Sequence, residues 1–125
     1  IAGAGVQKYG TELEEHQQLL LAVADILIEV YMAESAVLRA EKNIGVYGLE
    51  AQEHQVALSQ LYLYQAVEKI STKGREAILG FAEGDEQKAL LMGLKRFTKY
   101  MEYPNVIALR NKVAEKLTAE NVYCF

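Results

Sequence analysis

The chain has 125 residues, 51% of them hydrophobic and 24% charged, which is the composition of one soluble globular domain. Its formal net charge of −4, without a dense Lys/Arg cluster, disfavours nucleic acids and anionic membrane surfaces as partners. Cys124 is the only cysteine, which excludes an internal disulfide and a cysteine metal cluster and fits a reducing, cytoplasmic compartment.

The first expected helix occupies residues 11–43, which contain neither proline nor glycine. Thr11 and Glu14 form a capping-box pattern at its start, and Gly45 can close it in the left-handed conformation. Apolar residues form two adjacent stripes at helical spacing: Leu19, Val23, Ile26, Val30, Ala33 and Val37, and beside them Leu20, Ala24, Leu27, Tyr31 and Leu38. Such a wide apolar face needs more than one neighbouring helix.

A second helix is expected from about Leu49 to Ala82. Gly74 leaves two alternatives open, a continuous helix or a break at that residue. The apolar positions of its main face are Val56, Leu63, Val67, Ile70, Ala77 and Phe81.

Two shorter helices follow. Gly84 and Asp85 pair a helix-ending glycine with an N-capping aspartate for the third helix. Pro104 ends that helix, and Asn105 can cap a fourth. The predicted apolar stripes are Leu90, Leu94, Phe97 and Met101 in the third helix, and Val106, Leu109, Val113 and Leu117 in the fourth. Residues 121–125 carry no helix signal, and no segment shows the pattern of a strand.

The sequence therefore predicts an all-α fold, an antiparallel up-down bundle with two long and two or three shorter helices. Helices of about 33 residues span roughly 50 Å, whereas helices of about 16 residues span roughly 25 Å, so the short pair cannot cover the long pair. Either the second helix breaks at Gly74 and supplies a fifth helix, or the uncovered half packs on another part of a longer protein or on a second subunit.

His16 and His54 each follow acidic residues, which suggests a carboxylate-bridged dimetal bundle. Such sites need a glutamate three residues before each histidine, but Leu13 and Ala51 stand there. Each histidine also lies near the start of its helix, and an antiparallel pair places those starts at opposite ends. We therefore predict no metal site and assign both histidines to the surface.

Asp25 and Glu29 alone interrupt the apolar run of residues 19–33, so they are the acidic residues expected to be partly buried. A desolvated carboxylate can act as a general base. We favour a structural interpretation, in which they form a narrow solvated stripe or pair with Lys or Arg across an interface. They also break the run of about 20 uncharged residues that a membrane span needs.

The glycines near the start, Gly3, Gly5 and Gly10, do not form a dinucleotide-binding loop. That pattern needs a third glycine where Lys8 stands, and it needs a preceding strand. A phosphate site in this part of the chain is therefore rejected.

Tyr62 and Tyr64 are interpreted as core or interface residues, because tyrosine at helical spacing usually packs with its hydroxyl reaching water. Cys124 has no histidine nearby in the sequence and offers no argument for a nucleophile. We accordingly predict no catalytic, cofactor-binding or metal-binding residue within the chain.

A family resemblance supplies the functional expectation. Residues 4–17, AGVQKYGTELEEHQ, and residues 24–42, ADILIEVYMAESAVLRAEK, resemble the C-terminal extension of bacterial acyl-CoA dehydrogenases of the long-chain and very-long-chain-like type. Tyr103, Pro104, Asn105, Arg110 and residues 121–125 are similar to the end of such chains. The resemblance covers most of the chain, is weakest in residues 49–84 and includes no catalytic signature.

The resemblance implies a parent flavoenzyme that removes two hydrogens from a fatty acyl-CoA thioester and passes electrons from FAD to an electron-transfer flavoprotein. It implies that the base, the flavin contacts and the acyl pocket lie before this segment. The segment itself would be a non-catalytic helical domain that rests on the catalytic core or stabilises a dimer. We expect residues 1–125 to form one domain, a C-terminal fragment of a longer chain, because Ile1 is neither an initiator methionine nor part of a signal peptide.

The alternative is a free-standing helical interaction module, unrelated to flavin chemistry, whose exposed apolar half binds another protein. From the length and apolarity of the first helix, we predict that the Leu19–Tyr31 region contacts more than one neighbour. In the first interpretation, those neighbours include the rest of the parent chain or a second subunit.

Overall fold

The computed structural model describes residues 1–125, and all of its regular secondary structure is helical. The five α-helices are α1 (Ala2–Tyr9), α2 (Gln17–Tyr47), α3 (Glu53–Phe81), α4 (Gly84–Phe97) and α5 (Val106–Glu120), with the 3-10 turns η1 (Gly10–Glu15) and η2 (Glu50–Gln52) between them. The predicted all-α class is confirmed. The residues form two compact units, one of residues 1–30 and 67–101 and the other of residues 31–66 and 102–125.

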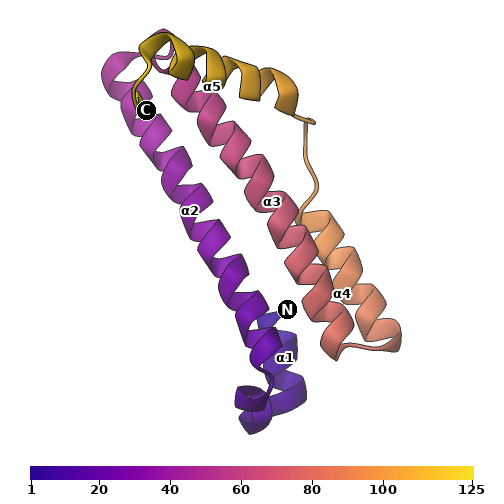
Figure 1. The fold of residues 1–125 in the computed structure, drawn as a ribbon. Helices are drawn as coiled ribbons and strands as arrows, with labels where there is room; N and C mark the ends of the chain where they lie inside the picture. Colours follow the sequence, from indigo (N-terminus) through magenta and orange to yellow (C-terminus); the bar gives the residue numbers. More distant parts are fainter. The chain divides into compact units, whose positions relative to one another are not determined.

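The first unit contains α1, the first half of α2, the second half of α3 and α4. Figure 1 shows α1 beside the start of α2 and α4 beside the end of α3. Asp25 and Glu29 of α2 face Lys73 and Lys69 of α3, in that order. Because residue numbers rise along one helix as they fall along the other, the two helices are antiparallel here, as predicted.

A small cluster of Ile78, Phe81 and Ala82, at the end of α3, forms the core of the first unit. Partly buried side chains from the N-terminal segment, α2 and α4 pack around it: Ile1, Ala4, Tyr9, Leu19, Leu90, Leu91 and Leu94. Leu90 and Leu94 therefore take the core positions that the sequence predicted for the third helix.

The second unit contains the rest of α2 and α3 together with α5. Asn43 donates a 2.7 Å hydrogen bond to the side-chain oxygen of the buried Gln55, and Ser59 donates to the carbonyl oxygen of Ala36 at 3.3 Å. In these two pairs, the residue numbers fall along α2 as they rise along α3. The long helices are therefore antiparallel in this unit too.

The fourth predicted helix is confirmed as α5. The side chain of Asn105 accepts a 3.1 Å hydrogen bond from the backbone N–H of Ala108, which is the predicted N-cap. Val113 is buried as predicted, whereas Leu117 is exposed. After α5, Arg39 donates to the carbonyl oxygen of Phe125 at 3.2 Å and holds the non-helical tail in this unit.

Alanine dominates what the chain buries. The ten buried apolar side chains are Ile78, Phe81, Val113 and seven alanines: Ala22, Ala33, Ala40, Ala57, Ala66, Ala77 and Ala82. Alanine allows helices to approach closely, but each methyl group removes little apolar area from water. Many larger apolar side chains remain exposed, among them Leu27, Tyr31, Leu38 and Phe97.

The predicted start of the first long helix was wrong. Gly10 takes a positive φ of 53° and ends α1, a helix that the sequence reading missed because of its glycines. Thr11 and Glu14 lie in η1 rather than in a capping box, and α2 begins only at Gln17. The ring of His16 stacks on Tyr9 with centroids 3.5 Å apart, so the chain folds back on itself before α2.

The predicted end of this helix was also early, because α2 continues through Gly45 to Tyr47. Gly48, with φ 85°, adopts the left-handed conformation and donates its N–H to the carbonyl oxygen of Ile44. The closing glycine is therefore Gly48.

The alternative of a break at Gly74 was wrong, because α3 is continuous from Glu53 to Phe81. Gly74 is buried, and a Cβ at this position would lie 2.7 Å from Cδ1 of Leu94. The glycine therefore permits close packing of α4 rather than a bend. The fifth helix of the chain is α1.

Two expectations for the third helix were wrong. Glu83 occupies the N-cap of α4, and Asp85 lies in its first turn instead of capping it. Phe97 is 87% exposed and Met101 lies beyond the helix, fully exposed, so only Leu90 and Leu94 of the predicted stripe are even partly buried. The stripe of the second long helix likewise leaves Leu63 exposed.

The two apolar stripes of α2 have different surroundings. In the first, Ala33 is buried and Leu19 packs against the core cluster, whereas Val30 is exposed. In the second, Leu27, Tyr31 and Leu38 are 63%, 69% and 56% exposed. The expectation that this chain does not cover both stripes is confirmed.

Candidate functional site

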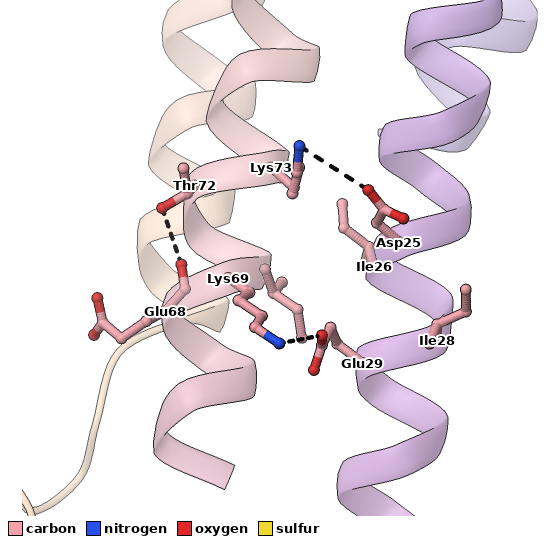
Figure 2. A pocket seen from close by; sticks show the side chains of 9 residues that line it. Asp25, Ile26, Ile28, Glu29, Glu68, Lys69, Thr72 and Lys73 are labelled. Atoms are coloured by element: carbon pink, nitrogen blue, oxygen red, sulfur yellow. Dashed lines mark hydrogen bonds and ion pairs between the residues drawn. The ribbon is translucent and has the colours of Figure 1, made fainter. Parts of the chain in front are cut away.

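Three surface grooves lie within the first unit, and they differ in chemistry. One is the charged groove between α2 and α3, whose lining side chains Figure 2 shows. Its volume is about 490 Å³. It is lined by Asp25, Ile26, Ile28, Glu29, Glu68, Lys69, Ile70, Thr72 and Lys73. The two acidic residues singled out in the sequence therefore lie at one site.

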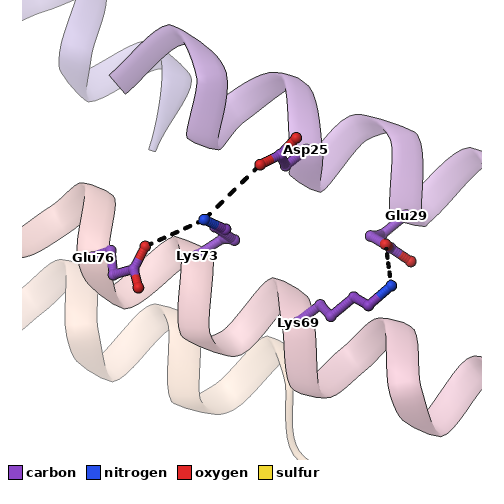
Figure 3. A network of polar contacts seen from close by, with 5 residues as sticks. All are labelled: Asp25, Glu29, Lys69, Lys73 and Glu76. Carbon is purple, nitrogen blue, oxygen red and sulfur yellow. Dashed lines mark hydrogen bonds and ion pairs between the residues drawn. The ribbon is translucent and has the colours of Figure 1, made fainter. Parts of the chain in front are cut away.

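Ion pairs join the walls of the charged groove, as Figure 3 shows. Lys69 Nζ lies 2.8 Å from Oε1 of Glu29, and Lys73 Nζ lies 4.0 Å from Oδ2 of Asp25 and 3.5 Å from Oε2 of Glu76. The predicted pairing of Asp25 and Glu29 with cations across an interface is confirmed. The pairs of Asp25 with Lys73 and of Glu29 with Lys69 therefore act as links between α2 and α3.

A second, more polar groove of about 630 Å³ lies between the start of α2 and the end of α3. The stacked rings of Tyr9 and His16 form part of its wall. Lys8 donates a hydrogen bond to the carbonyl oxygen of Phe81, which fastens α1 to the end of α3. The aromatic stack and this hydrogen bond are structural links between helices.

The third groove, of about 540 Å³, lies among the N-terminal residues, α2, α3 and α4 and is called the apolar groove below. Its lining is aliphatic or aromatic except for Thr98 and Gly93: Ile1, Ala2, Val23, Ile26, Leu27, Val30, Val67, Ile70, Ala89, Leu90, Gly93, Leu94, Phe97 and Thr98. Apart from the hydroxyl group of Thr98, the side chains of this surface offer none of the charged or hydrogen-bonding groups of a catalytic site.

The histidines and the cysteine do not form a constellation. His16 belongs to the first unit and His54 to the second, where its Nδ1 lies 3.9 Å from Glu53. Cys124 is a partly buried free thiol. The chain contains no group of three or more His, Cys, Asp or Glu side chains arranged to hold a metal ion.

The N-terminal glycines are part of helical structure rather than a phosphate loop. Gly3 and Gly5 lie inside α1, and Gly5 is buried, where a Cβ would lie 2.9 Å from Cδ2 of Leu19. Tyr62 and Tyr64 lie in α3 and are partly buried, as the core or interface interpretation requires.

One carboxyl group has a shifted pKa. Lys112 donates a 2.8 Å hydrogen bond to Glu53 and adds its positive charge, and together they hold the pKa of Glu53 below its ordinary value. Glu53 is exposed, and the pair links α5 to the start of α3. This shift therefore reflects a structural ion pair.

The apolar groove itself was not predicted, although the Leu19–Tyr31 region that the sequence marked for further contacts supplies Val23, Ile26, Leu27 and Val30 to it. Phe97 was assigned to the core stripe of its helix, and Leu27 to a stripe without a known neighbour. Both line this groove. The only signal in the sequence was the excess of apolar positions over the number of neighbouring helices.

None of the helices has the length and the continuous apolar character needed to span a bilayer.

Comparisons with known proteins give the family. A family model described as the acyl-CoA dehydrogenase C-terminal domain matches residues 1–96. A probable acyl-CoA dehydrogenase of Bacillus subtilis (strain 168) is 34% identical over 113 residues, which are 90% of this chain and 19% of that protein. The crystal structure of an acyl-CoA dehydrogenase complexed with FAD from Bacillus anthracis matches 99% of this chain and 22% of its own, with 32% identity and a TM-score of 0.95.

The chain thus spans about a fifth of the length of these relatives. The structural match extends over almost all of the chain, including the residues beyond 96. These findings favour the dehydrogenase interpretation over a helical module unrelated to flavin chemistry. The chain belongs to the acyl-CoA dehydrogenase C-terminal domain family.

Proposed function

We propose that this chain is a non-catalytic accessory domain of an acyl-CoA dehydrogenase-like flavoenzyme, which oxidises fatty acyl-CoA and which the domain stabilises by docking. The observation that carries the proposal is the large apolar surface of α2, where Leu27, Tyr31 and Leu38 are all more than half exposed. Large apolar side chains that recur at helical spacing and stay exposed are typical of an interaction site.

The mechanism of stabilisation follows from what the domain buries by itself. Its core consists largely of alanine, so much of the apolar area of its larger residues stays in water. Covering that area against the catalytic body or a second subunit would contribute roughly 25 cal/mol for each Å². A partner that binds only the folded domain also shifts its folding equilibrium toward the native state.

The flavin of the parent would bind outside this segment, because neither the charged groove nor the apolar groove fits FAD. Each lysine of the charged groove lies within 4.0 Å of a carboxylate, which opposes binding of a pyrophosphate. The apolar groove offers a single side-chain hydroxyl, that of Thr98, for the polar edge of an isoalloxazine ring. We therefore place the flavin contacts, the base and the acyl pocket in the rest of the parent and assign no catalytic, cofactor-binding or metal-binding residue here.

The electron acceptor of the parent is proposed from the family resemblance, and the cellular compartment is proposed from the composition of the chain. Electron-transfer flavoprotein would receive the electrons from the parent's FAD. The net charge of −4 argues against nucleic acid and anionic membranes as partners of this domain. The single cysteine fits a cytoplasmic enzyme, and residues 1–125 would form one C-terminal domain of it.

The test is a deletion of residues 1–125 from the full-length enzyme. We expect the truncated enzyme to bind flavin and to catalyse proton abstraction from acyl-CoA, while its Tm or its oligomeric state changes. A folded, flavin-loaded truncation that has lost proton abstraction would show that the domain takes part in chemistry and would overturn the proposal.

A point variant keeps the test decisive if the deletion does not fold. Leu38→Glu places a charge on the exposed apolar stripe of α2, whereas Ser35→Glu places one at an exposed polar position of the same helix. We expect only Leu38→Glu to lower the Tm or to change the oligomeric state of the full-length enzyme. Equal behaviour of the two variants would contradict docking through this stripe.

A further inference from the structure

The apolar groove has the form of a packing site for a missing helix. Its floor contains Leu90, Leu94 and Ile1, which also pack on the core cluster, and its rim contains the exposed side chains of Leu27, Val30 and Phe97. Removing these exposed apolar side chains from water is favourable, so a ligand in the groove would be stabilised by contact with the rim as well as with the floor.

The chemistry of the groove defines what fits it. Parts of three helices, α2, α3 and α4, supply most of its wall, and side chains on such surfaces form ridges and grooves that accept the ridges of another helix. An amphipathic helix with apolar residues at i, i+3, i+4 and i+7 would bury one face here and leave its polar face in water. A charged ligand would find only the hydroxyl group of Thr98.

The relatives indicate where such a helix can come from. The matched part is about a fifth of each relative, and its family is described as a C-terminal domain, so most of a parent polypeptide would precede it. Ile1 and Ala2 line the apolar groove. In such a polypeptide, the segment that enters the domain through Ile1 would arrive beside the groove, at a high effective concentration.

We propose that the apolar groove receives an amphipathic helix of the same polypeptide, from the dehydrogenase portion that precedes Ile1. This inference rests on the proposed function and deepens it, because it identifies the surface and the kind of segment through which the domain docks. A helix from a second copy of the protein is the competing occupant.

Photo-cross-linking in the full-length enzyme distinguishes these occupants. A benzophenone amino acid in place of Phe97 puts the cross-linker on the rim of the groove. The matched control carries the same amino acid in place of Met92, an exposed residue of α4 that does not line the groove. Both native side chains are exposed within this domain, so folding of the domain should tolerate the substitutions.

We expect the Phe97 position to give an intrachain cross-link to a helical peptide that precedes Ile1, in a product of monomer mass, and the Met92 position to give none. An interchain product of dimer mass would overturn the proposal in favour of a second copy. A lack of cross-linking above that of Met92 would show that the groove is open to solvent and would overturn it as well.

A pair of charge substitutions provides an independent measurement. Leu27→Glu alters the rim of the groove, whereas Leu21→Glu alters an equally exposed leucine of α2 that does not line it. We expect several-fold faster hydrogen exchange in the groove-lining peptides of the full-length enzyme for Leu27→Glu only. Equal exchange in both variants would contradict docking at the groove.

The flavin content of the purified full-length protein separates this inference from the function on which it rests. A protein without bound flavin would contradict the proposed function. The position of the cross-link in that same protein would still decide whether a preceding helix occupies the groove.

Discussion

Lys69 Nζ lies 2.8 Å from Oε1 of Glu29 and joins the second half of α3 to the first half of α2. The two side chains differ in burial, because that of Glu29 is 16% exposed and that of Lys69 is 60% exposed. Removal of the lysine therefore leaves a mostly buried carboxylate with less compensation. This change lowers the free energy of unfolding more than the loss of a fully solvated ion pair does.

We predict that Lys69→Met lowers the free energy of unfolding by about 1 kcal/mol, at the upper end for an ion pair that water partly screens. The matched control is Lys88→Met, because Lys88 lies 3.7 Å from Asp85 and both side chains are largely exposed. This control should change stability by less than about 0.5 kcal/mol. Urea denaturation measures both, and equal losses would contradict a special role for the link to Glu29.

Gly74 and Gly80 give a pair of opposite predictions within α3. Alanine is favoured over glycine inside a helix by about 1 kcal/mol. At Gly74, however, the added Cβ would lie 2.7 Å from Cδ1 of Leu94 and 3.2 Å from Cδ1 of Ile1, and crowding of this kind costs about 1–3 kcal/mol. At Gly80 nothing lies within 4 Å of the added atom.

We therefore expect Gly74→Ala to lower the free energy of unfolding by about 1 kcal/mol, and Gly80→Ala to raise it by about 0.5–1 kcal/mol. Thermal and urea unfolding measure both variants. A stabilising Gly74→Ala would show that Leu94 moves aside easily and that the close approach of α4 does not require glycine.

Local signals were enough to predict most of the helices. Pro104 and Asn105 mark the boundary between the third and fourth predicted helices. Proline has no backbone N–H to continue a helix, and the side chain of asparagine caps the next one, so both effects depend only on neighbouring residues. The start of α2 could not be predicted in this way. It depends on the contact of Tyr9 with His16, which forms only after Gly10 has turned the chain.

The candidate site was predictable in kind but not in detail. The interruption of an apolar helix by Asp25 and Glu29 predicted ion pairs, but the choice of Lys73 and Lys69 depends on the register of two helices about forty residues apart in sequence. Which stripe of α2 stays exposed is also a tertiary effect. Both stripes have similar apolarity, but the buried alanines of α2 are Ala22, Ala33 and Ala40, and only Ala33 belongs to a predicted stripe.

The pair of Glu53 and Lys112 gives a pH-dependent prediction. Since Lys112 lowers the pKa of Glu53 in the folded state, the unfolded state binds more protons in acid. The stabilisation is therefore present above the ordinary glutamate pKa and is lost as pH falls through the lowered folded value. Because the pair is exposed, we expect a small effect on Tm.

NMR titration of the Glu53 carboxyl carbon measures this shift directly. In Lys112→Met the pKa of Glu53 should rise toward its ordinary value, and the difference in Tm between the two proteins should shrink at acidic pH. Lys116→Met removes another cation of α5, one that lies 5.4 Å from the centre of the Phe125 ring, and should leave the Glu53 titration unchanged. A pKa of Glu53 that is the same with and without Lys112 would contradict the assignment.

Asn105 gives the last prediction, because its side chain accepts the N–H of Ala108 at the start of α5. We expect Asn105→Ala to lower the free energy of unfolding by about 1 kcal/mol, whereas Asn105→Asp keeps a capping oxygen and most of the stability. Asn111→Ala, inside the same helix and exposed, should instead be neutral or slightly stabilising. Urea unfolding measures the energies, and hydrogen exchange at the Ala108 amide locates the effect. Unchanged protection of that amide in Asn105→Ala would mean that another group or water satisfies it.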